Sequence, residues 1–143
     1  MFTFKTKAKS LLGVGLAACV GAVAFQSPTK AQKVSNISQV LVEASNIINQ
    51  QLPMNIDPTV RWDSTSAGPG KLINYNYTLV EYSATQLDGS QFASQFRPFV
   101  NDMLCNDSSS QIFRDKDVAI KINIYDNSQS LVSRVKVSPS ECR

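Results

Sequence analysis

Apolar residues recur at helical spacing in two segments of the chain. Over residues 37–48 they fall at positions i, i+3, i+4, i+7, i+10 and i+11, which gives a helix one apolar face. Pro53 ends this helix, because the residue before a proline avoids the helical conformation. A second segment, residues 90–105, has similar spacing and contains Pro98. Since proline removes a backbone donor, we expect a kinked helix or two short helices there.

Apolar and polar residues alternate in three other segments, as they do in half-buried strands. The clearest is residues 71–82, where Ile, Tyr, Tyr and Leu alternate with Asn and Thr. Residues 118–124 and 131–137 alternate in the same way and are separated by the polar residues 126–130. Two such strands joined by a short polar turn predict a β-hairpin.

A shorter strand is expected over residues 59–63, and the Ser-, Gly- and Pro-rich residues 64–70 are typical of a loop. The order is then helix, strand, strand, helix, strand, strand. Elements in this order favour an α+β fold, in which an antiparallel sheet of about four strands carries the helices on one face.

The first 31 residues have the layout of a secretory signal. Three lysines precede an apolar run of 15 residues, Leu11–Phe25, and the segment ends in small residues up to Ala31. The run is shorter than the roughly 20 apolar residues that span a membrane. We therefore expect residues 1–31 to be a signal peptide and residues 32–143 to form a single domain that is secreted or periplasmic.

A second interpretation of this signal stays open. The tetrapeptide Leu-Ala-Ala-Cys that ends at Cys19 resembles a lipobox, the sequence at which a bacterial lipoprotein receives its lipid. In that case Cys19 becomes the acylated N-terminus and anchors the protein to the outer membrane. Val20–Phe25 remain apolar after the cysteine, where a tether is usually polar, so we favour cleavage after Ala31.

Removal of residues 1–31 changes the charge of the chain. The whole chain carries 14 Lys and Arg against 11 Asp and Glu, for a net charge of +3. Four of the lysines lie in the signal, so residues 32–143 keep ten positive residues and have a net charge of −1. Nucleic-acid binding needs a concentrated positive surface, and we therefore expect no nucleic-acid partner. A membrane partner is expected only if Cys19 is acylated.

Two cysteines remain after the signal, Cys105 and Cys142. An even number of cysteines in an exported chain favours a disulfide, which would close a loop of about 38 residues and stabilise the fold by roughly 4 kcal/mol. The bridge would fasten a C-terminal strand that otherwise frays. The two cysteines lack the CxxC spacing of redox and metal sites, and the chain has no histidine to join them.

The absence of histidine removes the commonest general base and the commonest metal ligand. We assign no catalytic, metal-binding or cofactor-binding residues and expect no cofactor. Asp115 and Asp117 are interpreted as solvated loop residues. Asp57 and Asp63 are the carboxylate pair that a small hydrolase would use, provided that a cleft holds them within about 10 Å of each other.

Aromatic and basic residues form the candidate contact surfaces. Most aromatic residues on the predicted strands are expected in the core beneath the helices. An alternative places Trp62 and Tyr82 on the open sheet face or its rim, where an amphipathic ring suits protein contact. Outward positions of the hairpin carry a modest positive strip, formed by Lys121, Arg134 and Lys136. A solvated sheet face without a partner is the competing interpretation of this strip.

Several short motifs resemble those of small exported bacterial proteins. They are Asn-Tyr-x-Tyr-x-Leu ending at Leu79, the mid-chain Cys105, Ile-x-Ile-Tyr-Asp ending at Asp126 and Val-x-Pro-x-Glu-Cys ending at Cys142. The resemblance covers most of residues 37–142 and implies a fold and an exported compartment, without an activity. The chain differs from these proteins at Asn127-Ser128, where the hairpin usually has glycine.

The leading hypothesis is a non-enzymatic envelope or secreted protein that binds another protein through the open sheet face or an edge strand. The second is a lipid-anchored accessory factor of an envelope machine, such as a pilot protein for an outer-membrane channel, acylated at Cys19. The small hydrolase ranks third.

Overall fold

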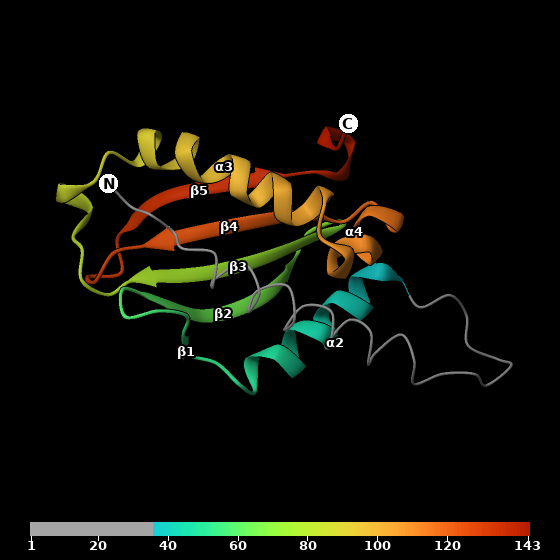
Figure 1. Ribbon diagram of the computed structural model, residues 1–143. Coiled ribbons are helices and arrows are strands. Elements are labelled where there is room, and N and C mark those ends of the chain that lie inside the picture. The colour runs from blue at the N-terminus through green and yellow to red at the C-terminus, as the bar shows by residue number, and fades with distance from the viewer. Residues whose placement is uncertain (1–35) are drawn as a thin grey trace, which may run out of the picture.

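The computed structural model describes residues 36–143 (Figure 1). The expected signal peptide and Cys19 lie outside the described residues. The helices are α2 (Ile37–Asn49), α3 (Gly89–Cys105) and α4 (Gln111–Asp115), with the 3-10 turns η1 (Ala84–Gln86), η2 (Ser108–Ser110) and η3 (Pro139–Glu141). The strands are β1 (Met54–Asn55), β2 (Val60–Gly68), β3 (Leu72–Leu79), β4 (Ala119–Tyr125) and β5 (Leu131–Val137).

The strands form one sheet in the order β1-β2-β3-β4-β5, and the α+β class is confirmed. β2 pairs with β3, and β4 with β5, as antiparallel hairpins. The sheet differs from the expected one in its fifth strand and in the parallel pairing of β3 with β4. The parallel pair follows from α3, whose 17 residues span about 25 Å, close to the length of β3. The helix returns the chain to the end of the sheet at which β3 begins, and β4 starts there in the same direction.

β2 is longer than the sequence predicts. Residues 64–70 were expected to form a loop, but the strand continues to Gly68, so that expectation is wrong. The register between β2 and β3 shifts between Trp62 and Ser64, which makes Asp63 the extra residue of a β-bulge. Because the bulge changes which residues face the helices, it interrupts the alternation by which a strand is recognised in a sequence.

α3 is one helix that continues through Pro98, so the alternative of two short helices is wrong. Asp88 caps its start by accepting hydrogen bonds from two backbone N–H groups of the first turn. The proline removes one donor from the helix interior. Phe96 and Val100, which are buried on either side of Pro98, hold both halves of the helix against the sheet.

α2 and α3 cover the same face of the sheet (Figure 1). α2 packs against β2 and α3 against β5, and the buried residues of both helices join the inward-facing strand residues in one apolar cluster. The opposite face, which we call the open face, is mostly polar. Its polar residues include Asp63, Ser64, Ser66, Asn74, Asn76, Thr78, Lys121, Asn123, Arg134 and Lys136.

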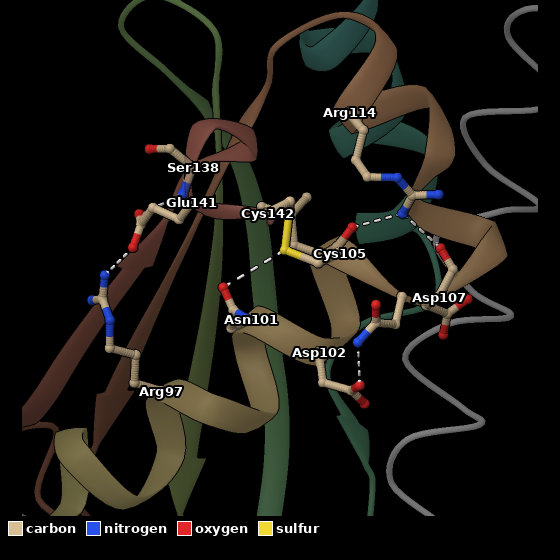
Figure 2. The surroundings of a disulfide bond; sticks show 11 residues. Arg97, Asn101, Asp102, Cys105, Asp107, Arg114, Ser138, Glu141 and Cys142 are labelled. Atoms are coloured by element: carbon tan, nitrogen blue, oxygen red, sulfur yellow. Dashed lines mark hydrogen bonds and ion pairs between the residues drawn. A yellow bond between two sulfur atoms is a disulfide. The ribbon is translucent and has the colours of Figure 1, made fainter.

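A disulfide joins Cys105, the last residue of α3, to Cys142 near the C-terminus, which is the pairing that the cysteine count predicts (Figure 2). The two Cα atoms are 5.2 Å apart. Arg114 of α4 closes the same end of α3, because its Nη1 donates to the carbonyl oxygens of Leu104 at 2.7 Å and Asp107 at 2.9 Å. A cation at this position also complements the negative end of the helix dipole.

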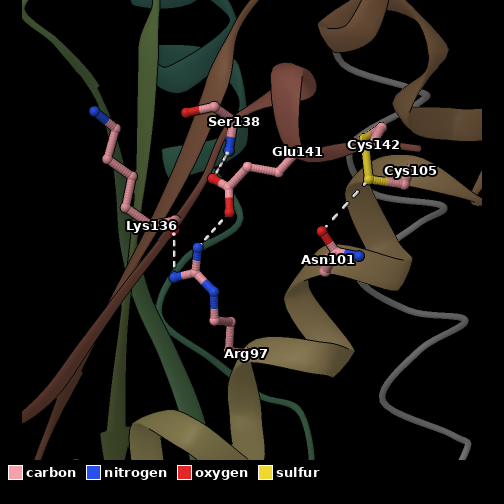
Figure 3. A network of polar contacts seen from close by, with 7 residues as sticks. All are labelled: Arg97, Asn101, Cys105, Lys136, Ser138, Glu141 and Cys142. Atoms are coloured by element: carbon pink, nitrogen blue, oxygen red, sulfur yellow. Dashed lines mark hydrogen bonds and ion pairs between the residues drawn. A yellow bond between two sulfur atoms is a disulfide. The ribbon is translucent and has the colours of Figure 1, made fainter.

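A second contact fastens the C-terminal residues to the middle of α3 (Figure 3). Arg97 forms an ion pair with Glu141 and donates a hydrogen bond from Nη1 to the carbonyl oxygen of Lys136 at 3.1 Å. Glu141 also accepts a hydrogen bond from the backbone N–H of Ser138, which, together with Arg97, lowers the pKa of the Glu141 carboxyl. We call the disulfide and the Arg97–Glu141 pair the C-terminal clamp.

Asp126 organises the turn between β4 and β5. The residue is only 1% exposed, and its Oδ1 accepts hydrogen bonds from the backbone N–H groups of Ser128 and Ser130. Its Oδ2 accepts from the N–H of Ala84 at 2.8 Å, which ties the hairpin to η1. These hydrogen bonds, above all the one from Ala84, lower the pKa of Asp126 to about 2. The turn has no glycine, and Gln129 takes the left-handed conformation, with φ of 66°.

Asp126→Asn should lower the melting temperature at pH 7 by roughly 5 °C or more, because an amide N–H₂ then faces the N–H of Ala84. The pKa of Asp126 is lower in the folded protein than in the unfolded chain, so the ionised carboxylate stabilises the fold at pH values above the unfolded pKa. This stabilisation is lost as the pH falls through the folded pKa. The difference between wild type and variant should therefore disappear between about pH 4 and pH 2. Thermal unfolding followed by circular dichroism at pH 7, 4 and 2.5 measures it. The exposed Asp115→Asn is the control, and equal losses in both variants would contradict the role of Asp126.

Candidate functional site

A hydrogen-bonded row of side chains crosses four strands of the open face. Arg134 on β5 donates from Nε to Asn123 Oδ1 at 2.9 Å. Asn123 Nδ2 donates to Asn76 Oδ1 at 2.8 Å, and Asn76 Nδ2 donates to Ser64 Oγ at 2.9 Å. Because each amide accepts a hydrogen bond on its oxygen and donates one from its nitrogen, these hydrogen bonds fix the orientation of every side chain in the row. We call these four residues the polar row.

The three basic residues singled out in the sequence lie next to the polar row. Lys121 on β4 and Lys136 on β5 are directly opposite each other in the register, and Arg134 precedes Lys136 by two residues on the same face. Arg134 and Lys136 are exposed and Lys121 is half-buried. The structure thus brings these three residues together on two neighbouring strands, and their role in partner contact stays a prediction.

The acidic pair considered for hydrolysis is engaged by neighbouring groups. Asp57 Oδ1 accepts hydrogen bonds from the Thr59 N–H at 2.7 Å and the Val60 N–H at 2.9 Å, as expected of a turn residue. Asp63 lies on the bulge of β2, where it pairs with Arg61 Nε at 2.5 Å and accepts a hydrogen bond from Thr78. Both carboxylates therefore hold local structure, Asp57 in the turn before β2 and Asp63 at the bulge.

Trp62 belongs to the core. It is 2% exposed, and its ring centroid lies 5.6 Å from that of Tyr75 and 6.0 Å from that of Tyr77. The alternative that placed Trp62 on the open face or rim is wrong, because the residue precedes the bulge and points toward the helices. Burial raises the pKa of Tyr77 well above its usual value. Tyr82 is half-buried against the same cluster, and its role in contact stays a prediction.

The two-residue strand β1 pairs only with Arg61 and Trp62 of β2, and a side chain from α2 covers the β2 edge beyond them. Asn49 Nδ2 donates to the Thr65 carbonyl oxygen at 2.8 Å, and Asn49 Oδ1 accepts from the Thr65 N–H at 2.8 Å. The amide therefore satisfies both backbone groups that Thr65 directs away from β3. This contact protects the edge against pairing with another chain.

The β5 edge is covered by α3 in a similar way. Arg97 caps the outward carbonyl oxygen of Lys136. At the other end of the strand, a Cβ at Gly89 would lie 2.1 Å from the carbonyl oxygen of Val132, so only glycine allows the helix to approach this closely. An incoming strand would have to displace α3 from both positions, which disfavours the edge-strand mode of binding.

Asn49→Ala should lower the free energy of unfolding by about 1–3 kcal/mol, because it leaves two partly buried backbone groups of Thr65 without partners. The freed edge should also promote self-association. Urea unfolding and sedimentation velocity measure the two effects. Asn46→Ala on the exposed side of the same helix is the matched control, since it makes the same change in helix propensity. A variant at position 49 that is as stable and as monomeric as this control would refute the edge assignment.

The sequence pattern did not point to several residues that shape these surfaces. Asn76 and Asn123 were visible only as polar positions of alternating strands, and their contact depends on the parallel pairing of β3 with β4. Asn49 and Arg97 have no local signature, because their roles depend on which strand lies beside each helix.

The part of the chain that the structure describes, residues 36–143, contains no group of three or more His, Cys, Asp or Glu residues arranged to hold a metal ion. None of its helices has both the length and the apolar composition needed to cross a membrane.

Comparison with known proteins identifies structural neighbours. No protein family and no curated protein matches the sequence. The fold matches that of a predicted secreted protein from Pseudomonas aeruginosa with a TM-score of 0.64 and 10% identity, over 79% of this chain and 100% of the other. It also matches the pilotin EpsS of the Vibrio vulnificus type 2 secretion system with a TM-score of 0.58 and 13% identity, over 75% of this chain and 92% of the pilotin. These likenesses show the fold of the chain, an α+β fold that it shares with both proteins.

Proposed function

We propose that the chain is an exported, non-enzymatic protein of the bacterial envelope that acts by binding another protein. The observation that carries the proposal is the fold shared with a pilotin over 92% of the pilotin chain. The disulfide supports an exported compartment, since disulfides persist in oxidising environments. The structural hydrogen bonds of Asp57 and Asp63 support a binding function over hydrolysis.

The open face is the binding surface in this proposal. Asn49 occupies the β2 edge, and Arg97 and Gly89 cover the β5 edge, so strand addition is disfavoured at both. Trp62 is buried and unavailable for contact. The open face combines basic residues with the polar row, a mixture that suits a partner recognised by polar and charged groups.

A pilot-like lipoprotein is the second candidate, and the pilotin neighbour together with the lipobox-like sequence at Cys19 favours it. In this form the protein is acylated at Cys19 and accompanies a channel component to the outer membrane. In the first form it begins at Gln32 and is secreted or periplasmic.

The intact mass of the protein purified from its native host separates the two forms. The mass of a chain that begins at Gln32 supports the secreted or periplasmic form. The mass of a chain that begins at an acylated Cys19 supports the anchored form. In the second case Cys19→Ser should release the protein from the membrane fraction. A mature product that still begins at Met1 and stays in the cytosol would contradict export altogether.

Protein binding is tested by a photo-cross-linking amino acid at the exposed position 66 of the open face, with position 95 on the exposed side of α3 as the control. The proposal expects one discrete adduct from position 66 in living cells and none from position 95. Equal adducts from both positions, or none from either, would contradict binding through the open face. A mass-spectrometric identification of the adduct names the partner.

A further inference from the structure

The basic residues of the described chain are unevenly distributed. Residues 36–143 carry nine Lys and Arg against eleven Asp and Glu, so this part of the protein is slightly acidic. Three of the nine nevertheless lie together on the β4–β5 half of the open face. We call Lys121, Arg134 and Lys136 the basic strip.

The two lysines of the basic strip are held close together by the sheet. The Lys136 carbonyl oxygen accepts from Arg97 and therefore points away from β4, so Lys136 and Lys121 form a pair without mutual backbone hydrogen bonds. Side chains are closest in pairs of this kind, with Cβ atoms about 4.5–5.5 Å apart. Like charges directly opposite each other destabilise a sheet. An anion bound between the two ammonium groups would relieve this repulsion.

The described chain does not supply that anion. Asp63, on the β2 half of the open face, is paired with Arg61 and hydrogen-bonded to Thr78. Glu141, at the far side of β5, forms an ion pair with Arg97 and accepts a hydrogen bond from the Ser138 N–H. The charge of Lys136 also contributes to lowering its pKa. Neither Lys121 nor Arg134 forms an ion pair with a carboxylate in residues 36–143.

The guanidinium of Arg134 is already oriented. Its Nε is bound to Asn123, which is 6% exposed and is itself held by Asn76. Within residues 36–143, the two Nη atoms of this exposed side chain form no hydrogen bond. A guanidinium fixed through Nε presents its Nη atoms as a fork that matches a carboxylate, and little side-chain entropy is lost on binding.

We propose that the basic strip binds an extended acidic segment of the partner protein, with carboxylates at alternate positions. Arg134 and Lys136 are two residues apart on one strand, and the repeat of alternate side chains, about 6.8 Å, is the same in an extended peptide. One carboxylate then meets the Arg134 fork and the next lies between Lys136 and Lys121. This inference rests on the proposed protein-binding function and specifies the chemistry of the partner.

The test uses the disulfide-bonded protein in its processed form and a fluorescent heptapeptide that alternates threonine and glutamate. Fluorescence anisotropy should show binding of this peptide, and no binding of the same peptide with glutamine in place of glutamate. Lys121→Gln combined with Lys136→Gln should weaken binding by at least about tenfold, and Arg134→Lys should also weaken it, because lysine lacks the fork. The control, Lys116→Gln combined with Arg143→Gln, removes the same charge elsewhere and should change affinity by less than about twofold.

Other results would overturn the inference. The first is an equal loss of peptide affinity in both double variants. The second is equal binding of a peptide whose glutamates lie in one block. The third is tighter binding to phosphatidylglycerol vesicles or to inorganic phosphate than to the alternating peptide. A cross-link from position 66 that survives the replacement of Lys121, Arg134 and Lys136 by glutamine would overturn it while leaving the proposed function intact. Absence of the cross-link when Lys121, Arg134 and Lys136 are all present would instead overturn the proposed function.

Discussion

Replacement of Cys105 and Cys142 by alanine in one variant should lower the free energy of unfolding by about 2–5 kcal/mol. The bridge spans 37 positions of the sequence, and without it the unfolded chain regains the freedom that the loop had removed. This is a large share of the stability of a domain of this size, which is typically about 5–15 kcal/mol. Urea unfolding of both proteins, with the same probe and buffer, measures the difference.

Loss of the disulfide should also weaken the protection of the β5 edge. The disulfide holds η3 and with it Glu141, which pairs with the same Arg97 that caps the Lys136 carbonyl oxygen (Figure 3). When the C-terminal residues fray, Arg97 loses one of its two partners, and the edge becomes easier to expose. We therefore expect the double variant to self-associate more readily than the wild type in sedimentation velocity.

Arg97→Ala is the matched control for this prediction. It breaks the ion pair and the carbonyl cap while leaving the disulfide in place, so it should increase self-association with a stability loss of only about 1 kcal/mol, as for other exposed pairs. Reduction of the wild-type protein with dithiothreitol should reproduce the behaviour of the double cysteine variant. If the reduced and oxidised proteins unfold at the same urea concentration, the disulfide does not have the stabilising role assigned to it.

The elements with a regular apolar period were predictable from the sequence. α2 and the β4–β5 hairpin occur where the 3.6-residue and two-residue periods predicted them, because packing on a single core preserves those periods. The disulfide was predictable because only one pairing of two cysteines exists once Cys19 is set aside. The continuation of β2 to Gly68 was not, since the bulge at Asp63 and the polar composition of the open face remove the period.

The candidate site was predictable only in part. The basic strip follows from the outward positions of one hairpin, so strand alternation alone brings Lys121, Arg134 and Lys136 together. The polar row joins strands that are far apart in the sequence, and it depends on the crossover through α3. An alternation pattern reports the face on which a residue lies, but not the strand beside it. For this reason the orientation of Arg134 by Asn123 appears only in the structure.

Trp62→Ala should be one of the most destabilising single substitutions in the described chain, with a loss of about 3–5 kcal/mol. The indole is packed against Tyr75 and Tyr77 between the sheet and the helices, so its removal leaves a cavity that the rigid strands cannot close. Urea unfolding measures the loss. Partner cross-linking at position 66 should persist under conditions in which the variant remains folded, because Trp62 lies on the other side of the sheet.

Trp62→Phe separates the packing of the ring from its polar group. The indole Nε1 is buried and has no hydrogen-bond partner in residues 36–143, and a buried unpaired donor costs about 1–3 kcal/mol. Phenylalanine removes that donor and keeps much of the aromatic volume, so the two changes offset each other and the net loss should stay below about 1.5 kcal/mol. If Trp62 were a contact residue, both substitutions would change the stability little and both would weaken partner binding. Near-wild-type stability of Trp62→Ala would therefore contradict the core assignment and return Trp62 to the set of candidate contact residues.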